Sequence, residues 1–146
     1  MYNTIKNLHS YWAYFVILIL VVAVINALIK RVQNKDYTDK DLRIFLFALV
    51  FSHLQLLIGL VLYFVSPMFE LWGELGGEVM KNATARLYLV EHPLVNILAI
   101  VLITVGFSKH KKKETSAAKF KTILLMYLIA IVLLLSRIPW DAWPRL

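Results

Sequence analysis

The chain has 146 residues, of which 60% are hydrophobic and only 17% are charged. This composition, with a mean hydropathy of +0.70, excludes an ordinary soluble globular domain and predicts a protein embedded in a lipid bilayer. The sequence contains no cysteine, which excludes disulfides, thiolate metal sites, iron–sulfur clusters, covalently attached c-type haem and cysteine nucleophiles.

Four apolar runs follow one another along the chain. About 20 helical residues cross roughly 30 Å of hydrocarbon, and the first three runs reach this length outright. The fourth does so only if its charged ends extend toward the interfaces. The sequence therefore predicts an all-α fold, an integral membrane four-helix bundle that forms a single domain over residues 1–146. Its helices are expected at about 8–31, 40–66, 84–107 and 117–138.

The basic residues are concentrated in two connections between these runs. Residues 30–43 and 108–121 carry eleven of the sixteen lysines and arginines. Short basic loops stay on the cytoplasmic side, so both termini are expected on the extracytoplasmic side of a bacterial inner membrane. The net charge of +7 is thus explained by membrane topology and does not indicate nucleic acid binding. All four tryptophans then fall at the outer interface: Trp12, Trp72, Trp140 and Trp143.

Two histidines, His53 and His92, lie inside apolar runs. Each is about 15 residues, or about 22 Å, from the expected cytoplasmic end of its helix. Because the two helices are consecutive and antiparallel, we expect the imidazoles to meet in the outer half of the bilayer. Two facing imidazoles are the axial ligands of a b-type haem, so the sequence predicts haem b between His53 and His92.

The remaining histidines fall outside this pair. His9 is expected roughly 9 Å further out, as a reserve metal ligand or a residue at the edge of the site. His110 stands among lysines of the second basic connection, where a solvated side chain is expected.

Polar residues near the predicted pair support a site inside the bundle. Gln55, Glu91 and Asn96 are costly in lipid and are expected to face the interior. Asn96 is one helical turn from His92, where it can orient the imidazole. Pro93 removes a backbone donor and frees the carbonyl of Leu89.

Two arginines are expected at the outer ends of their helices. Arg86 precedes His92 in the third run, and Arg137 follows the fourth run. Both are on the side where the propionates of a haem would need cations. Their alternative role is to anchor the helix ends at the interface.

Four segments carry a resemblance: LHSYWAYFVIL, FSHLQLLIGLVLYFVSP, VEHPLVNILAIVLITVG and SRIPW. On these segments, which are spread along most of the chain, the sequence resembles a family of small four-helix membrane proteins of Bacteroidetes that is often labelled cytochrome b. The resemblance implies that His9, His53 and His92 are the family's histidines, and that Arg86 and Arg137 are its buried or interfacial arginines. The arrangement is also similar to half of a haem A synthase, although the full pattern of that family is not found here.

These observations predict a membrane-bound cytochrome that transfers electrons near the outer side of the membrane, as a carrier in a respiratory chain. Bis-histidine ligation leaves no open iron position, so electron transfer is expected rather than stand-alone enzyme chemistry. The expected partners are the lipid bilayer and a quinol or a larger respiratory complex.

Two other functions are compatible with the same residues. One is a non-redox accessory subunit of a larger membrane complex, in which the histidines make only interhelical hydrogen bonds. The other is a haem or copper assembly factor that binds its cargo transiently through His9, His53 and His92. The sequence has no HExxH motif, no phosphate-binding loop and no recognisable nucleophile–base pair.

Overall fold

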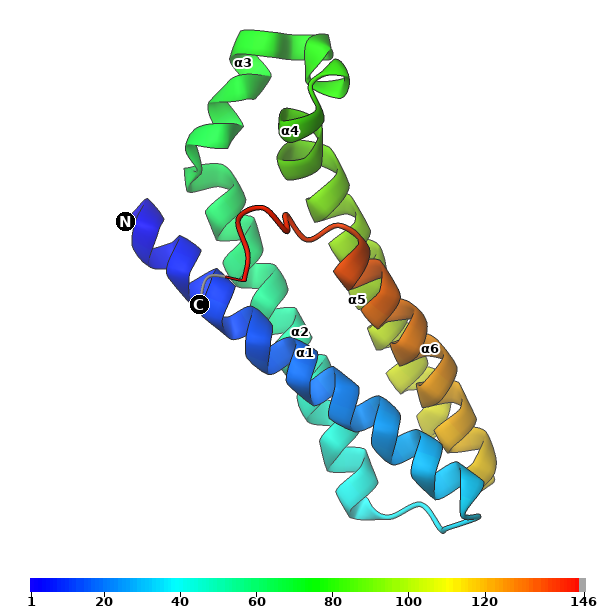
Figure 1. The fold of residues 1–146 in the computed structure, drawn as a ribbon. Helices are drawn as coiled ribbons and strands as arrows, with labels where there is room; N and C mark the ends of the chain where they lie inside the picture. Colours follow the sequence, from blue (N-terminus) through cyan, green and yellow to red (C-terminus); the bar gives the residue numbers. More distant parts are fainter. Residues whose placement is uncertain (145–146) are drawn as a thin grey trace.

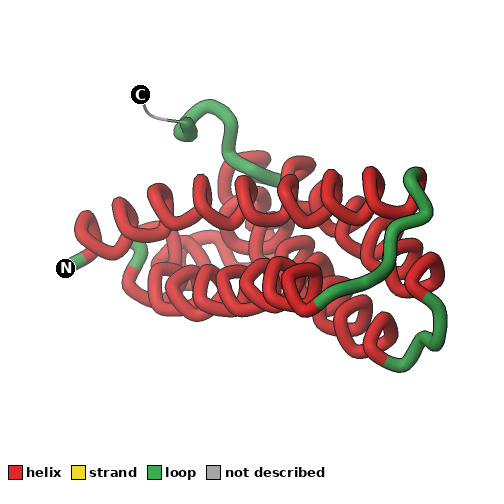
Figure 2. The backbone as a smooth tube through the Cα atoms, turned by 90° about the horizontal axis from the view of Figure 1, so that it is seen from below, coloured by secondary structure: helices red, strands yellow, loops and turns green. Residues whose placement is uncertain are grey.

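The computed structural model describes residues 1–144, which form helices and connecting turns with no strand. Four helical spans account for most of this range: α1 (Tyr2–Val32), α2 (Asp39–Val65), a third span over Ala83–Lys111, and α6 (Ser116–Ser136). Each span is long and apolar enough to cross a membrane. The prediction of an all-helical chain with four membrane-compatible helices is therefore confirmed, and Figure 2 shows these helices running alongside one another.

The third span is built from three pieces. It begins with α4 (Ala83–Arg86), passes through a single π-helical segment, η3 (Leu87–Glu91), and continues as α5 (His92–Lys111). Between α2 and α4 the chain forms a cap of short helices: η1 (Pro67–Glu70), α3 (Leu71–Leu75) and η2 (Gly76–Lys81). Figure 1 shows this cap joining the ends of α2 and α4.

The long helices pack as an up-and-down ring. α1 contacts α2 and α6, and α5 contacts the same two helices from the other side. We call the end that holds the first turns of α1, the cap and residues 137–144 the terminal end. The opposite end, which holds the connections 33–38 and 112–115, is called the basic end. In Figure 1 the segment after α6 turns back toward α1 at the terminal end.

Local hydrogen bonds fix the helix starts at the basic end. The side chain of Asp41 accepts from the backbone N–H of Thr38 at 2.8 Å, which completes a capping box at the start of α2. Thr115 Oγ1 accepts from the N–H of Ala118 at 3.2 Å and caps α6. Ser116 Oγ also accepts from the N–H of Tyr37 at 2.9 Å, which joins the two basic connections.

The third span continues beyond its expected end. We expected it to stop near residue 107, but α5 runs to Lys111. Gly106 does not end the helix: it lies where α5 presses against α6, and an added Cβ would stand 2.6 Å from Cβ of Met126. His110 is fully buried rather than solvated, and its packing against Phe45 and Phe107 extends the helix by one turn.

The core is dense toward the basic end. Aromatic side chains from three spans meet there, with Phe45, Phe120 and Tyr127 all fully buried. Tyr127 Oη donates to the backbone oxygen of Phe45 at 2.9 Å and ties α6 to α2. Small residues elsewhere in this core allow close helix contacts: Ala23, Ala27, Ala48, Ala99 and Ala130.

Candidate functional site

A cavity of about 270 Å³ occupies the half of the bundle nearer the terminal end. This volume is close to the lower end of the range for ligand pockets, about 300 to 1,000 Å³. The lining is mostly apolar and comes from all four spans and from the segment after α6. A few polar side chains reach it, among them Lys6, His9, Gln55, His92 and Asn96.

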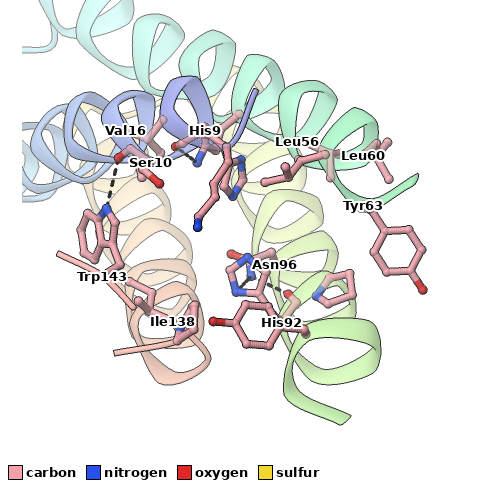
Figure 3. A pocket seen from close by; sticks show the side chains of 18 of the residues that line it. His9, Ser10, Val16, Leu56, Leu60, Tyr63, His92, Asn96, Ile138 and Trp143 are labelled. Carbon is pink, nitrogen blue, oxygen red and sulfur yellow. Dashed lines mark hydrogen bonds between the residues drawn. The ribbon is translucent and has the colours of Figure 1, made fainter. Parts of the chain in front are cut away.

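The imidazoles of His9 and His92 face one another across this cavity. Their ring centroids are 6.2 Å apart, and the ring planes are inclined by 76°. His9 belongs to α1 and His92 to the first turn of α5, so the pair joins helices that are not neighbours in the ring. Figure 3 shows His9 on one side of the space and His92 with Asn96 on the other.

His92 is held by the backbone of the segment after α6. Its Nδ1 lies 2.7 Å from the backbone oxygen of Arg137. A carbonyl oxygen only accepts, so Nδ1 carries the proton and Nε2 keeps its lone pair. Asn96, one turn further along α5, donates to the backbone oxygen of His92 and lies 3.2 Å from Nδ1. The predicted position of Asn96 beside His92 is thus seen in the structure.

The backbone before His92 departs from regular α-helix. Pro93 has no N–H, and the freed carbonyl of Leu89 accepts a hydrogen bond from Tyr63 Oη at 3.1 Å. The π-helical segment η3 lies directly before His92, and such segments are frequent at functional sites. Together, Pro93 and the π-helical segment set the direction in which the side chain of His92 points from the third span.

His9 is positioned by two residues of α2. Gln55 Nε2 donates to the backbone oxygen of His9 at 2.9 Å. Gly59, one turn further along the same face, lies so close that an added Cβ would be 3.0 Å from Cε1 of His9. His9 Nδ1 and Gln55 Oε1 are both buried without a hydrogen-bond partner. Two unpaired polar atoms beside an apolar cavity favour a ligand that satisfies them.

The structure does not bring His53 and His92 together. His53 Nδ1 donates to the backbone oxygen of Leu49 at 2.8 Å, and its Nε2 lies 3.3 Å from Oγ1 of Thr104 on α5. Thr104 is twelve residues from His92, or about 18 Å along the helix. The expectation of equal depth failed because α5 extends to Lys111 and because α2 and α5 are staggered along their axes.

Arg86 and Arg137 are also engaged away from the cavity. Arg86 Nε lies 2.8 Å from one carboxylate oxygen of Glu91, and Arg137 Nε lies 3.4 Å from the other. Neither arginine is among the described residues that line the cavity. The two cations expected to serve propionates therefore share one carboxylate, which fixes the start of the third span to the end of α6.

A second polar cluster lies at the basic end, far from the cavity. His110 Nδ1 donates to the backbone oxygen of Phe107, and its Nε2 accepts from Tyr37 Oη at 2.8 Å. Asp41, fully buried, pairs with Lys30 at 2.7 Å. Burial, with the nearby carboxylates of Asp41 and Asp39, raises the pKa of Tyr37 to about 12. These contacts join the connection 33–38 to α5 and α1 to α2, so we assign the cluster to stability.

The sequence named His9 as a reserve ligand, but the pairing of His9 with His92 and the close approach of Gly59 were not predicted, although spacing signals exist. Lys6 and His9 are three residues apart on α1, and Gln55 and Gly59 are four apart on α2, so each pair shares a helix face. A glycine one turn from a buried glutamine indicates a close approach of the neighbouring helix. His9 was placed roughly 9 Å further out by counting residues from the basic end of the first helix. The longer α5, which runs to Lys111, carries His92 out to the depth of His9. The first helix itself, expected from about residue 8, begins at Tyr2.

Among residues 1–144, no group of three or more His, Asp or Glu side chains is arranged to hold a metal ion. Comparison of the chain with protein-family models, with curated proteins and with solved structures gave no match.

Proposed function

We propose that this chain is a membrane-bound b-type cytochrome in which His9 and His92 would hold one haem. The spacing of the two rings carries the proposal. Two metal–nitrogen bonds of about 2 Å each, with the ring radii added, separate the centroids of opposed imidazoles by about 6 Å. The observed separation of 6.2 Å fits this value. Two protein ligands would suffice for a haem iron, because the porphyrin supplies the remaining nitrogen donors.

The surroundings of both histidines support the same assignment. Metal-bound histidines usually donate their second ring nitrogen to a carbonyl or carboxylate, and His92 Nδ1 does so to Arg137. The lone pair of His92 Nε2 is thereby left for a metal. His9 offers a buried nitrogen without a partner beside the same cavity. The mostly apolar lining suits the faces of a macrocycle.

Haem bound in this way would supply one-electron redox chemistry. Because the imidazoles of His9 and His92 would both hold the haem, the protein would carry electrons and would not activate oxygen. The protein's part is to fix the two imidazoles from α1 and α5 and to exclude water from the cavity. A quinol or a larger respiratory complex in the same membrane would be the electron partner.

We assign the terminal end to the extracytoplasmic side of a bacterial inner membrane. Both basic connections lie at the opposite end, where the positive-inside rule places them in the cytoplasm. The absence of native cysteine allows a direct test with single cysteines at Lys81 and Lys113. In intact spheroplasts a membrane-impermeant maleimide should label Lys81→Cys and not Lys113→Cys. The reverse labelling pattern would overturn the orientation.

The cytochrome proposal is tested by absorption spectroscopy of the detergent-purified protein. A dithionite-reduced minus oxidised spectrum should show a sharp α band in the wild type. The band should be lost in His9→Ala and in His92→Ala but retained in His53→Ala, which removes a histidine from the same bundle outside the cavity. Size-exclusion chromatography of each variant separates loss of haem from loss of fold.

Two results would contradict the proposal. One is a protein that stays colourless after haemin is supplied, which would favour the accessory-subunit alternative. The other is a band that depends on His53 and survives in His9→Ala, which would place the ligand pair elsewhere. Rescue of His92→Gly by added imidazole would show that the lost group is a ligand and not merely a packing element.

A further inference from the structure

The cavity has a single permanently charged residue among the described residues that line it. This residue is Lys6, and no aspartate, glutamate or arginine stands beside it in that lining. A cation next to an apolar cavity is costly unless it gains a counter-charge or keeps contact with water. The position of Lys6 therefore needs an explanation that lipid contact does not give.

Lys6 is placed one turn before His9 on the same face of α1. A three-residue separation corresponds to about 4.5 Å along the axis, so Lys6 lies between the imidazole pair and the terminal end. Its side chain is half-buried, and its ammonium group lies 5.8 Å from the ring centroid of Tyr2.

The other described basic side chains near this end of the bundle are already paired. Arg86 and Arg137 share Glu91, and Lys81 pairs with Glu78 at 2.8 Å. Within residues 1–144, no ion pair involves Lys6. Lys6 is thus the basic side chain in the described cavity lining that remains for an anionic group of a ligand.

We propose that Lys6 binds a propionate carboxylate of the haem, so that the carboxylate edge of the cofactor faces the terminal end. This assignment rests on the proposed ligation by His9 and His92. It differs from the sequence-based expectation, which gave the propionates to Arg86 and Arg137. It also predicts that electrons are exchanged at the terminal end, because the polar edge of the cofactor would lie nearest the outer surface.

The test compares haemin with haemin dimethyl ester, in which both propionates are neutral. Apoprotein is titrated with each compound, and binding is followed by the absorption change. Wild-type protein should bind haemin roughly tenfold or more tightly than the ester, as expected for a charge-assisted hydrogen bond. Lys6→Gln should bind haemin more weakly by the same factor and leave the ester affinity unchanged.

Lys81→Gln is the matched control, because Lys81 is also at the terminal end but is exposed and does not line the cavity. It should behave as the wild type with both compounds. A preference for haemin that persists in Lys6→Gln would overturn the role of Lys6 while leaving the ligation by His9 and His92 intact. If neither compound gives an α band with wild-type protein, the ligation itself fails and the role of Lys6 falls with it.

Discussion

Gly59 on α2 lies directly against the imidazole of His9 on α1, so that a Cβ at position 59 would be 3.0 Å from Cε1. The nearest side-chain atoms are those of a proposed haem ligand. The size of residue 59 therefore controls where His9 stands in the cavity, although the residue itself would bind nothing.

A graded series at position 59 should weaken haem binding. Gly59→Ala should shift the imidazole by a few tenths of an ångström and reduce haemin affinity several-fold, whereas Gly59→Leu should abolish the α band, because overpacking costs about 1–3 kcal/mol and more for larger groups. Titration of apoprotein with haemin measures both effects. Gly73→Ala is the control, since nothing lies within 4 Å of the added Cβ there. Unchanged affinity in Gly59→Leu would argue against His9 as a ligand.

Gly106→Ala should destabilise the bundle without involving the cavity. The added methyl would stand 2.6 Å from Cβ of Met126, an atom fixed to the backbone of α6, so α5 and α6 must separate. We expect the overpacking to cost about 1–3 kcal/mol of stability. Over most of this range the cost exceeds the gain of about 1 kcal/mol that alanine gives over glycine in helix propensity. Thermal unfolding in detergent, compared with Gly77→Ala, measures it. A stabilised Gly106→Ala protein would contradict the tight α5–α6 contact.

Asp41→Asn should destabilise the basic end. The carboxylate pairs with Lys30 at 2.7 Å, accepts from Asn26 at 2.8 Å and completes the cap at Thr38. Removing its charge leaves Lys30 without a counter-charge. We expect a loss of about 2 to 3 kcal/mol, less than for a fully buried pair, because the Lys30 side chain is 21% exposed.

The control for this variant is Asp36→Asn, in the exposed part of the first connection. A solvated surface carboxylate should change stability by no more than about 0.5 kcal/mol. Chemical unfolding in mixed micelles compares the two variants with the wild type. Equal stability of both variants would show that the network around Asp41 adds little.

Titration of Tyr37 should lower the stability of the folded protein in strong base. Its pKa is raised to about 12 in the folded protein, above the ordinary value of 10.0. Between these values the unfolded chain loses the phenolic proton while the folded protein keeps it, so stability falls as pH rises from 10 toward 12. Tyr37→Phe should be less stable than wild type at pH 7, because it loses the hydrogen bond to His110, and should show a smaller decline above pH 10.

Thermal unfolding at pH 7, 9 and 11 separates these two effects. Tyr11→Phe is a suitable control, because Tyr11 is 62% exposed on α1. A decline above pH 10 that is identical in Tyr37→Phe and wild type would show that Tyr37 does not titrate as assigned.

The sequence alone determined the number of membrane-compatible helices. Apolar length and the positions of charges are local properties, so they can be read without knowledge of the packing. The interruption at Pro93 was equally local, since a missing N–H must free the carbonyl of Leu89 wherever the helix lies. The same holds for the cap at Thr38, where the hydrogen-bonding residues are neighbours in the chain.

Only the tertiary structure decided which histidines meet. The choice between His53 and His9 as the partner of His92 depends on helix ends and on the stagger between helices, and an error of one turn shifts a side chain by about 5.4 Å. Burial of His110 against Phe45 lengthened α5 by one turn. Counting residues along the sequence could not predict this contact between helices. The apolar length of each helix follows from its own residues. The pairing of His9 with His92 depends instead on how α1, α2 and α5 pack together.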